Sequence, residues 1–254
     1  LMTRAEWAAI ALWCKANGCL PKGNNNYGKD ASEGGYKAIP APGVNDSGRT
    51  ARVLTGTGSV SWSHDGTLEG IWDLNGNIWE WNGGSRTVKG ELQVLVNNNA
   101  ADLDHSQAAS SAQWKAIDAT TGAYITPNGS GTTANSIKLD WVSGKITYSA
   151  TITTQADASR DCAFASVTCA SSVSAAAQAV LKALAFLPAS ATASEYEDDH
   201  MWMNNGADER AFYSGGNWAI GASAGLFALG GNNPRSSSNW SLGFRSAYVD
   251  LPTE

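Results

Sequence analysis

The chain has 254 residues, with 17 Lys and Arg against 23 Asp and Glu, which gives a formal net charge of −6. This length suits one large domain that builds its own hydrophobic core. The acidic balance argues against a nucleic-acid surface, which needs a basic patch. No stretch approaches the roughly 20 apolar residues of a membrane-spanning helix. The charged fraction of 16%, with 27 Gly and 11 Trp, favours a turn-rich fold over a helical bundle.

The four cysteines form two local pairs, Cys14 with Cys19 and Cys162 with Cys169. Neither pair has the CxxC spacing of a zinc or redox site. Two local disulfides would suit an exported or virion protein, whereas a free thiol is a common filler on the core side of a helix. The sequence favours the free thiol at Cys14 and leaves the disulfide state of the others open.

The first expected element is a helix between Thr3 and Gly18. Thr3-x-x-Glu6 is a capping box, and Gly18 stands where a helix-terminating glycine belongs. Apolar residues follow the cap at helical spacing: Trp7, Ile10, Ala11 and Cys14. From 21 to 50 the sequence is dominated by turn-forming Gly, Pro and Asn, which predicts a long loop.

The middle of the chain predicts a helix and a hairpin. A helix is expected over 106–117, burying Trp114 and Ile117. Period-two alternation on both sides of Ser143-Gly144 predicts an antiparallel hairpin over 137–152.

The last third of the chain predicts one helix and one strand. An apolar stripe predicts a helix over 174–187 that Pro188 ends. Residues 206–243 are glycine-rich and show little periodicity in their apolar residues. The pattern over 244–251 predicts a final strand. Few helices, short strands and long loops together predict an α+β fold.

Residues 221–225 match GxSxG, the nucleophile elbow of α/β-hydrolases, with Ser223 as its serine. That fold needs a histidine after the serine, but His64, His105 and His200 all precede it. No alternating strand–helix series surrounds the motif either. We therefore expect a glycine-flanked loop.

Residues 195–200 hold four acids and His200, which could supply oxygen ligands to a hard cation. The spacing fits no defined site, and a solvated charge run is the commoner outcome. The three histidines offer no HxxxH or HxH ligand set. No cofactor is expected, although a structural calcium ion remains an open alternative.

Residues 70–81 form the most informative string, GIWDLNGNIWEW. Three indoles, those of Trp72, Trp79 and Trp81, bracket an Asn-Gly turn. We expect the indoles to anchor loops to the core, while Asn77 and Glu80 hydrogen-bond to backbone.

This string resembles the GxxDxxGNVWEW signature of the formylglycine-generating-enzyme branch of the C-type lectin fold. Residues 214–218 (SGGNW) resemble the RGGSW of that branch, and 243–245 match its closing GFR. Its catalytic members hold copper-binding cysteines between these strings, and this chain has no cysteine after Cys169. Three scattered histidines also offer no counterpart to the site of its iron-dependent, sulfoxide-forming members. The resemblance therefore implies the fold without that chemistry.

Residues 224–229, 232–236 and 243–246 further resemble the variable proteins of diversity-generating retroelements, as do two amino-terminal strings, 5–7 and 23–28. In that family, miscopied adenines turn Asn codons of the ligand face into codons for most other residues. Matching to the family pattern implies that these positions contact ligand: Tyr213, Ala219, Ile220, Ala222, Ser223, Gly230, Gly231, Ser237 and Ser241. Scaffold roles fall to these residues: Trp79, Trp81, Trp218, Phe227, Trp240, Phe244 and Arg245.

The expected fold is therefore α+β, a formylglycine-generating-enzyme-like C-type lectin fold with short strands, two or three helices and long loops. One domain would span 1–254, with an insertion at 90–200 that the resemblance leaves unexplained and a variable region at 211–249. The expected function is recognition, without catalysis, of a protein or glycan on a target cell by a protein displayed on a phage or cell surface. Nucleic-acid binding and membrane insertion are not expected. The alternative is an enzyme or metal-binding protein with its site in the insertion.

Overall fold

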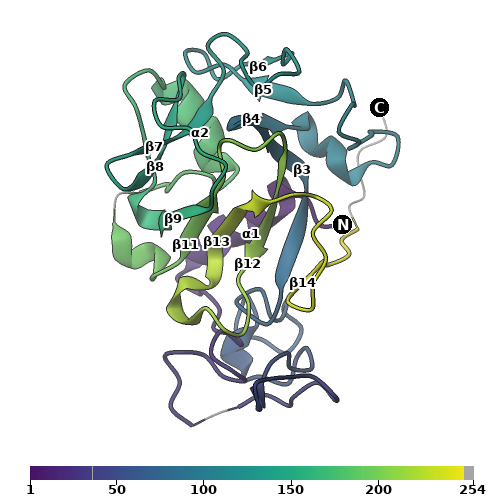
Figure 1. Ribbon diagram of the computed structural model, residues 1–254. Coiled ribbons are helices and arrows are strands. Elements are labelled where there is room, and N and C mark those ends of the chain that lie inside the picture. The colour runs from purple at the N-terminus through teal and green to yellow at the C-terminus, as the bar shows by residue number, and fades with distance from the viewer. Residues whose placement is uncertain (36, 191, 249–254) are drawn as a thin grey trace.

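The computed structural model describes residues 1–35, 37–190 and 192–248. The fold is mixed α+β and mostly sheet, with helices α1 (Arg4–Asn17) and α2 (Ala175–Ala183) in the described residues. Figure 1 shows α1 behind the centre of a large sheet, with the largely irregular segment between α1 and β3 gathered below it. The α+β class predicted from the sequence is confirmed.

The large sheet has 12 strands, nine of which follow the order β10-β8-β7-β4-β3-β12-β13-β11-β9. These nine are β3 (Trp79–Val88), β4 (Glu91–Val94), β7 (Lys138–Val142), β8 (Lys145–Ser149), β9 (Arg160–Ala163), β10 (Thr168–Cys169), β11 (His200–Met203), β12 (Arg210–Gly215) and β13 (Gly225–Asn233). Off this path, β5 (Lys115–Ile117) pairs with β4 and with β6 (Tyr124–Ile125), and β14 (Leu242–Gly243) runs parallel to β3. A separate ribbon joins β1 (Asn45–Asp46) to β2 (Arg49–Thr50).

Helix α1 begins and ends where the sequence predicts. The Thr3 side chain accepts from the Glu6 N–H, the Glu6 carboxylate accepts from the Thr3 N–H, and Gly18 closes the helix with a φ of 66°. The Trp7 indole N–H donates to the Leu226 carbonyl at 2.8 Å, which fastens the helix to β13. Cys14 is fully buried, as expected for a core thiol, and burial raises its pKa to about 12. All four cysteines are free.

The hairpin predicted over 137–152 is confirmed as β7 and β8. Ser143 and Gly144 form its turn with φ values of 51° and 76°, the left-handed pair that a two-residue hairpin turn requires. The alternation sends Leu139, Ile146 and Tyr148 into the core.

The helix predicted over 106–117 is wrong. The segment forms turns and then β5, although Trp114 and Ile117 are buried as expected. The Trp114 indole N–H donates to the Ala108 carbonyl at 2.9 Å, and the Arg86 guanidinium lies 4.3 Å from its ring centre. A folded loop and strand pairing therefore bury these two side chains, and the apolar face of a helix does not.

Helix α2 begins at Ala175, with Ser174, the first residue of the predicted helix, as its cap, but it ends at Ala183, four residues before the predicted end. Ala185 has a φ of 49°, which a continuing helix excludes. The buried guanidinium of Arg4 donates to the Leu184 and Ala185 carbonyls at 2.8 and 2.7 Å. A charged side chain from α1 thus caps the end of α2, which local sequence could not reveal.

The carboxyl-terminal quarter differs most from expectation. The glycine-rich segment 206–243 contains β12 and β13 at the middle of the sheet. The strand predicted over 244–251 is wrong for 244–248, which form no strand, and 249–251 lie outside the described residues.

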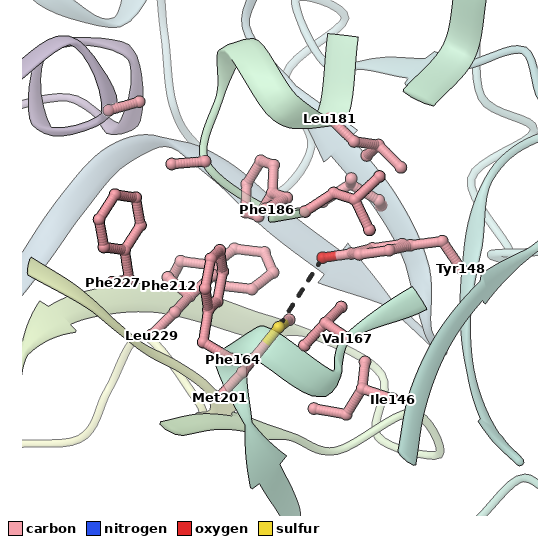
Figure 2. Packing of buried hydrophobic residues seen from close by; sticks show 14 of the residues in the cluster. Ile146, Tyr148, Phe164, Val167, Leu181, Phe186, Met201, Phe212, Phe227 and Leu229 are labelled. Carbon is pink, nitrogen blue, oxygen red and sulfur yellow. Dashed lines mark hydrogen bonds between the residues drawn. The ribbon is translucent and has the colours of Figure 1, made fainter. Parts of the chain in front are cut away.

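A largely aromatic core lies between the sheet and the helices (Figure 2). The Phe164 ring stacks on Phe227 at 5.3 Å, and Tyr196 meets Phe227 edge-on at 4.9 Å. On the α2 side, Phe186 and Phe212 lie 5.0 Å apart. The segment 90–200 supplies several of these side chains and shares one core cluster with α1 and β13.

Candidate functional site: two loops around Trp218

The segment 217–224 joins β12 to β13 through the short turn η5 (Gly221–Ser223). Its backbone is fixed, because the Gly221 N–H donates to the Asn25 carbonyl at 2.9 Å. Four expected variable positions lie here with exposed or half-buried side chains: Ala219, Ile220, Ala222 and Ser223. The loop therefore presents one aliphatic side chain, Ile220, and three small ones from a backbone held in place.

Trp218 anchors this loop. Its side chain is 2% exposed, and its indole N–H donates to the Asp46 carboxylate at 3.2 Å. Its carbonyl accepts from the Tyr27 N–H at 2.8 Å. A buried indole with a satisfied N–H is a rigid attachment point, so the loop cannot shift without disturbing the segment that carries Tyr27 and Asp46.

A second loop, 234–241, joins β13 to β14. The Asn239 side-chain oxygen accepts from both the backbone N–H and the hydroxyl of Ser241 at 2.9 Å. The Ser241 carbonyl accepts from the Trp79 N–H at 2.8 Å, which ties the loop to β3. Ser237 and Ser241, both expected variable positions, are half-buried.

The two loops meet through their tryptophans. The rings of Trp218 and Trp240 lie 4.8 Å apart at 67°, in an edge-to-face arrangement. Trp240, expected as scaffold, is 48% exposed, so it belongs to the surface as well as to this contact. We call the segments 217–224 and 234–241 together the two-loop surface.

Three expected variable positions lie elsewhere, inside the sheet. Tyr213 is 4% exposed, and its hydroxyl donates to the Asn232 side chain. Gly230 lies directly under this ring, since an added Cβ would lie 2.1 Å from it. A Cβ on Gly231 would lie 2.6 Å from the Phe212 ring. The structure thus buries these positions, and the two glycines have no room for a side chain.

The remaining expected scaffold residues divide into buried and exposed groups. Phe227 is 1% exposed, whereas Phe244 is 68% exposed. Trp79 and Trp81 are half-buried, and both rings meet Tyr213 edge-on, at 4.9 and 5.3 Å. These contacts form an aromatic row across β3 and β12 next to the two-loop surface.

Arg245 joins the two strings that carry the family resemblance. Its guanidinium donates to both oxygens of the Glu80 carboxylate at 3.0 and 2.8 Å, and to the Trp72 carbonyl at 2.9 Å. Burial raises the pKa of Glu80, while the Arg245 charge opposes that rise. Glu80 therefore binds a guanidinium, and the expectation that it bonds to backbone is wrong.

Asp73, beside this ion pair, is also buried. Burial raises its pKa to about 6, against an opposing hydrogen bond from the Gly56 N–H and the charge of Arg245. Asn77, by contrast, bonds to backbone as expected, accepting from the Val53 N–H at 2.9 Å.

The acidic run 195–200 points in several directions. Glu195 pairs with Lys15 at 2.5 Å, whereas Asp199 is 3% exposed and accepts from the Phe227 N–H at 2.7 Å. The second Asp199 oxygen has no hydrogen-bond partner among the described residues, and burial raises the pKa of this carboxyl well above its ordinary value. Sequence reasoning missed Asp199 because nothing local marks one acid of the run as buried.

Each histidine lies beside a different carboxylate, His64 with Asp65, His105 with Asp102 and His200 with Asp161. Within the described ranges, no group of three or more His, Cys, Asp or Glu side chains could hold a metal ion. The arrangement around Trp218 is suited to binding through surface shape and direct contact.

No protein-family model matches the chain, and no curated protein matches it. In the part of the chain that the structure describes, no helix has both the length and the apolar character needed to cross a bilayer.

Proposed function

We propose that the chain is a ligand-recognition protein that binds through the two-loop surface. The observation that carries this proposal is the contact between Trp218 and Trp240, which fixes two surface loops against each other. Binding surfaces built on a rigid base lose little conformational entropy when they engage a partner. The loops can therefore vary in side chain while the backbone stays in place.

The chemistry of the surface supports binding rather than catalysis. Its expected variable residues carry no group that titrates near neutral pH: Ala219, Ile220, Ala222, Ser223, Ser237 and Ser241. General acid–base or metal chemistry needs such groups, whereas recognition needs shape, apolar contact and hydrogen bonds. The partner in this proposal is a protein or glycan on a target cell.

We further propose the formylglycine-generating-enzyme-like C-type lectin fold and diversification by a retroelement. The support is that Arg245 of the closing GFR string binds Glu80 of the WEW string, so two of the strings behind the resemblance form one structural unit. Display on a phage tail or cell surface is the setting that this proposal implies.

Sequencing of sibling loci tests the proposal. We expect substitutions to concentrate at the six two-loop positions and to spare Trp218 and Phe227. Because Gly230 and Gly231 have no room for a side chain, we expect both to be unchanged as well. An adenine-rich near-copy of codons 211–249 beside a reverse-transcriptase gene would support the proposal. Substitutions spread evenly along the chain would contradict it.

A further inference from the structure

A cavity of about 370 Å³ is continuous with the two-loop surface, because Arg235 of the second loop forms part of its wall. Trp81 of β3, Trp114 and Phe244 supply aromatic walls. Phe244 is 68% exposed, so much of its ring is open to a partner. A cavity of this size and composition accepts an apolar group. The recognition surface therefore extends from the loops into an apolar cavity.

The charge at the cavity wall is positive. Arg235 donates to both oxygens of Glu209 at 2.7 Å, and Arg86 donates to the same carboxylate at 2.8 Å. One carboxylate thus lies between two guanidinium groups, which leaves one positive charge in excess. Among the described residues that line the cavity, Arg235 alone has a charged side chain.

Acids that flank this cluster are paired with cations of their own. The Ser136 hydroxyl donates to Glu91 at 2.7 Å and accepts from Lys138 at 2.8 Å, so that acid and that cation lie together. Two further pairs are Asp208 with Lys89 at 3.6 Å and Asp157 with Arg210 at 3.2 Å. The excess charge therefore stays with Arg86 and Arg235.

This charge is accessible at Arg235. The Arg235 side chain is 41% exposed, whereas that of Arg86 is 8% exposed and lies 4.3 Å from the centre of the Trp114 ring. Arg235 uses three of its N–H groups, two on Glu209 and one on the Gln107 carbonyl at 2.8 Å. A guanidinium has five such donors, so two remain on the terminal nitrogens of Arg235 for a ligand.

We infer, with the proposed function as the premise, that the partner presents an acidic protein segment in which an apolar side chain lies beside an Asp or Glu. The apolar side chain enters the cavity between Trp81 and Phe244, and the carboxylate accepts from Arg235. A second carboxylate gives the cluster two acids for two guanidinium groups, which balances its charge. Aromatic residues and Arg are the types enriched at the centre of protein–protein interfaces, and an aromatic wall favours a buried apolar side chain over a hydroxyl-rich sugar.

Selection of short random peptides, displayed on phage, on the immobilised full chain tests this inference. We expect the selected peptides to be enriched in Asp or Glu close to Trp, Phe or Leu, and depleted in Lys and Arg at the same positions. The reason is the single accessible positive charge beside an apolar cavity. Failure to select any peptide, or selected peptides without enrichment in acids, would overturn the inference.

Variants then place the carboxylate at Arg235. The probes are the most enriched peptide and a copy in which its acids are replaced by the corresponding amides, both titrated by calorimetry. Arg235→Gln should weaken the acidic peptide about fivefold and leave the amide copy unchanged, whereas Arg235→Lys should keep the preference for the acid. The matched control is Lys145→Gln, which removes one exposed positive charge outside the cavity and should change neither affinity. Equal affinity of wild type and Arg235→Gln for the acidic peptide would overturn the inference.

The apolar half of the site has its own variant. Phe244→Ala removes an exposed wall and should weaken both peptides alike, because it leaves the charge in place. Unchanged affinity for both peptides would overturn the placement of the apolar side chain in the cavity.

Exchange of the six expected variable residues of the two loops separates this inference from the proposed function. Peptides that depend on those six residues but show no preference for acids would overturn the inference and leave the proposed function standing. Acid-dependent peptides whose affinity ignores the six residues would support the acidic site at Arg235 and contradict the proposed function.

Discussion

The centre of β13 and the two-loop surface belong to the same glycine-rich segment, yet they differ in what they can accommodate. Gly230 lies under the Tyr213 ring with no space for a Cβ. Ala219 and Ala222, a few residues earlier, are exposed on a loop whose backbone is tied to Trp218 and Asn25. Small residues therefore occur in this segment for two opposite reasons. Inside the sheet, close packing leaves no room for a larger side chain. On the loop, the side chains face free space.

Under the proposed function, this difference separates a fixed frame from an exchangeable surface. Rings and an ion pair hold the frame at Trp218, Tyr213 and Arg245, whereas the side chains of Ala219 and Ala222 are exposed. Stability and recognition should therefore respond to different substitutions within one segment.

The largest effect should come from Arg245→Met, on the fixed side of the comparison. It leaves the buried Glu80 carboxylate without its partner, and breaking such a pair costs about 3–5 kcal/mol. Because burial already raises the pKa of Glu80, the loss should shrink as pH falls and the carboxyl becomes protonated. Urea unfolding of wild type and variant across pH measures this. An equal loss at every pH would mean that the charge of Glu80 is not responsible.

Gly230→Ala should follow, at about 1–3 kcal/mol, because its Cβ must displace a Tyr213 ring that lies against Trp79 and Trp81. The matched control is Ala222→Val on the exposed loop, which should stay within about 0.5 kcal/mol. Thermal unfolding distinguishes the two. If both variants melted alike, the contrast between sheet centre and loop would be wrong.

Asp199→Asn should have a smaller effect of opposite sign. The folded-state pKa of Asp199 is raised above its ordinary 3.8, so its contribution to stability is full below that value and is lost as pH rises through the folded pKa. The amide keeps the bond from Phe227 and removes the charge. The variant should therefore melt higher than wild type at neutral pH and equal to it near pH 3.8. A lower melting temperature at neutral pH would contradict a buried, unpaired carboxylate.

Sequence reasoning predicted the elements whose signals are local. Thr3, Glu6 and Gly18 fix the ends of α1, and Ser143-Gly144 fixes the β7–β8 turn. The end of α2 depends on Arg4, which is about 180 residues away, and local periodicity carries no trace of it.

The candidate site was predictable only in part, for the same reason. Strands β12 and β13 were missed because ring packing over glycines replaces the alternating apolar pattern that predicts strands. Matching to the family pattern assigned both Gly230 and Ala222 to the variable face, because a pattern of codons carries no information about which side chains are buried. The ion pair between Arg245 and Glu80 could have been predicted, because both residues belong to the strings that resemble the family signature.

The most direct test of the central claim is one library that randomises the six two-loop positions and is displayed on phage. Its members would be scored for folding by protease resistance and then selected on immobilised streptavidin as a probe protein. We expect most members to remain folded and selection to yield specific binders, whereas a same-sized library at exposed positions of the β7–β8 hairpin should yield none. If most two-loop members were protease-sensitive, or both libraries yielded binders equally, the two-loop surface would not be the recognition site.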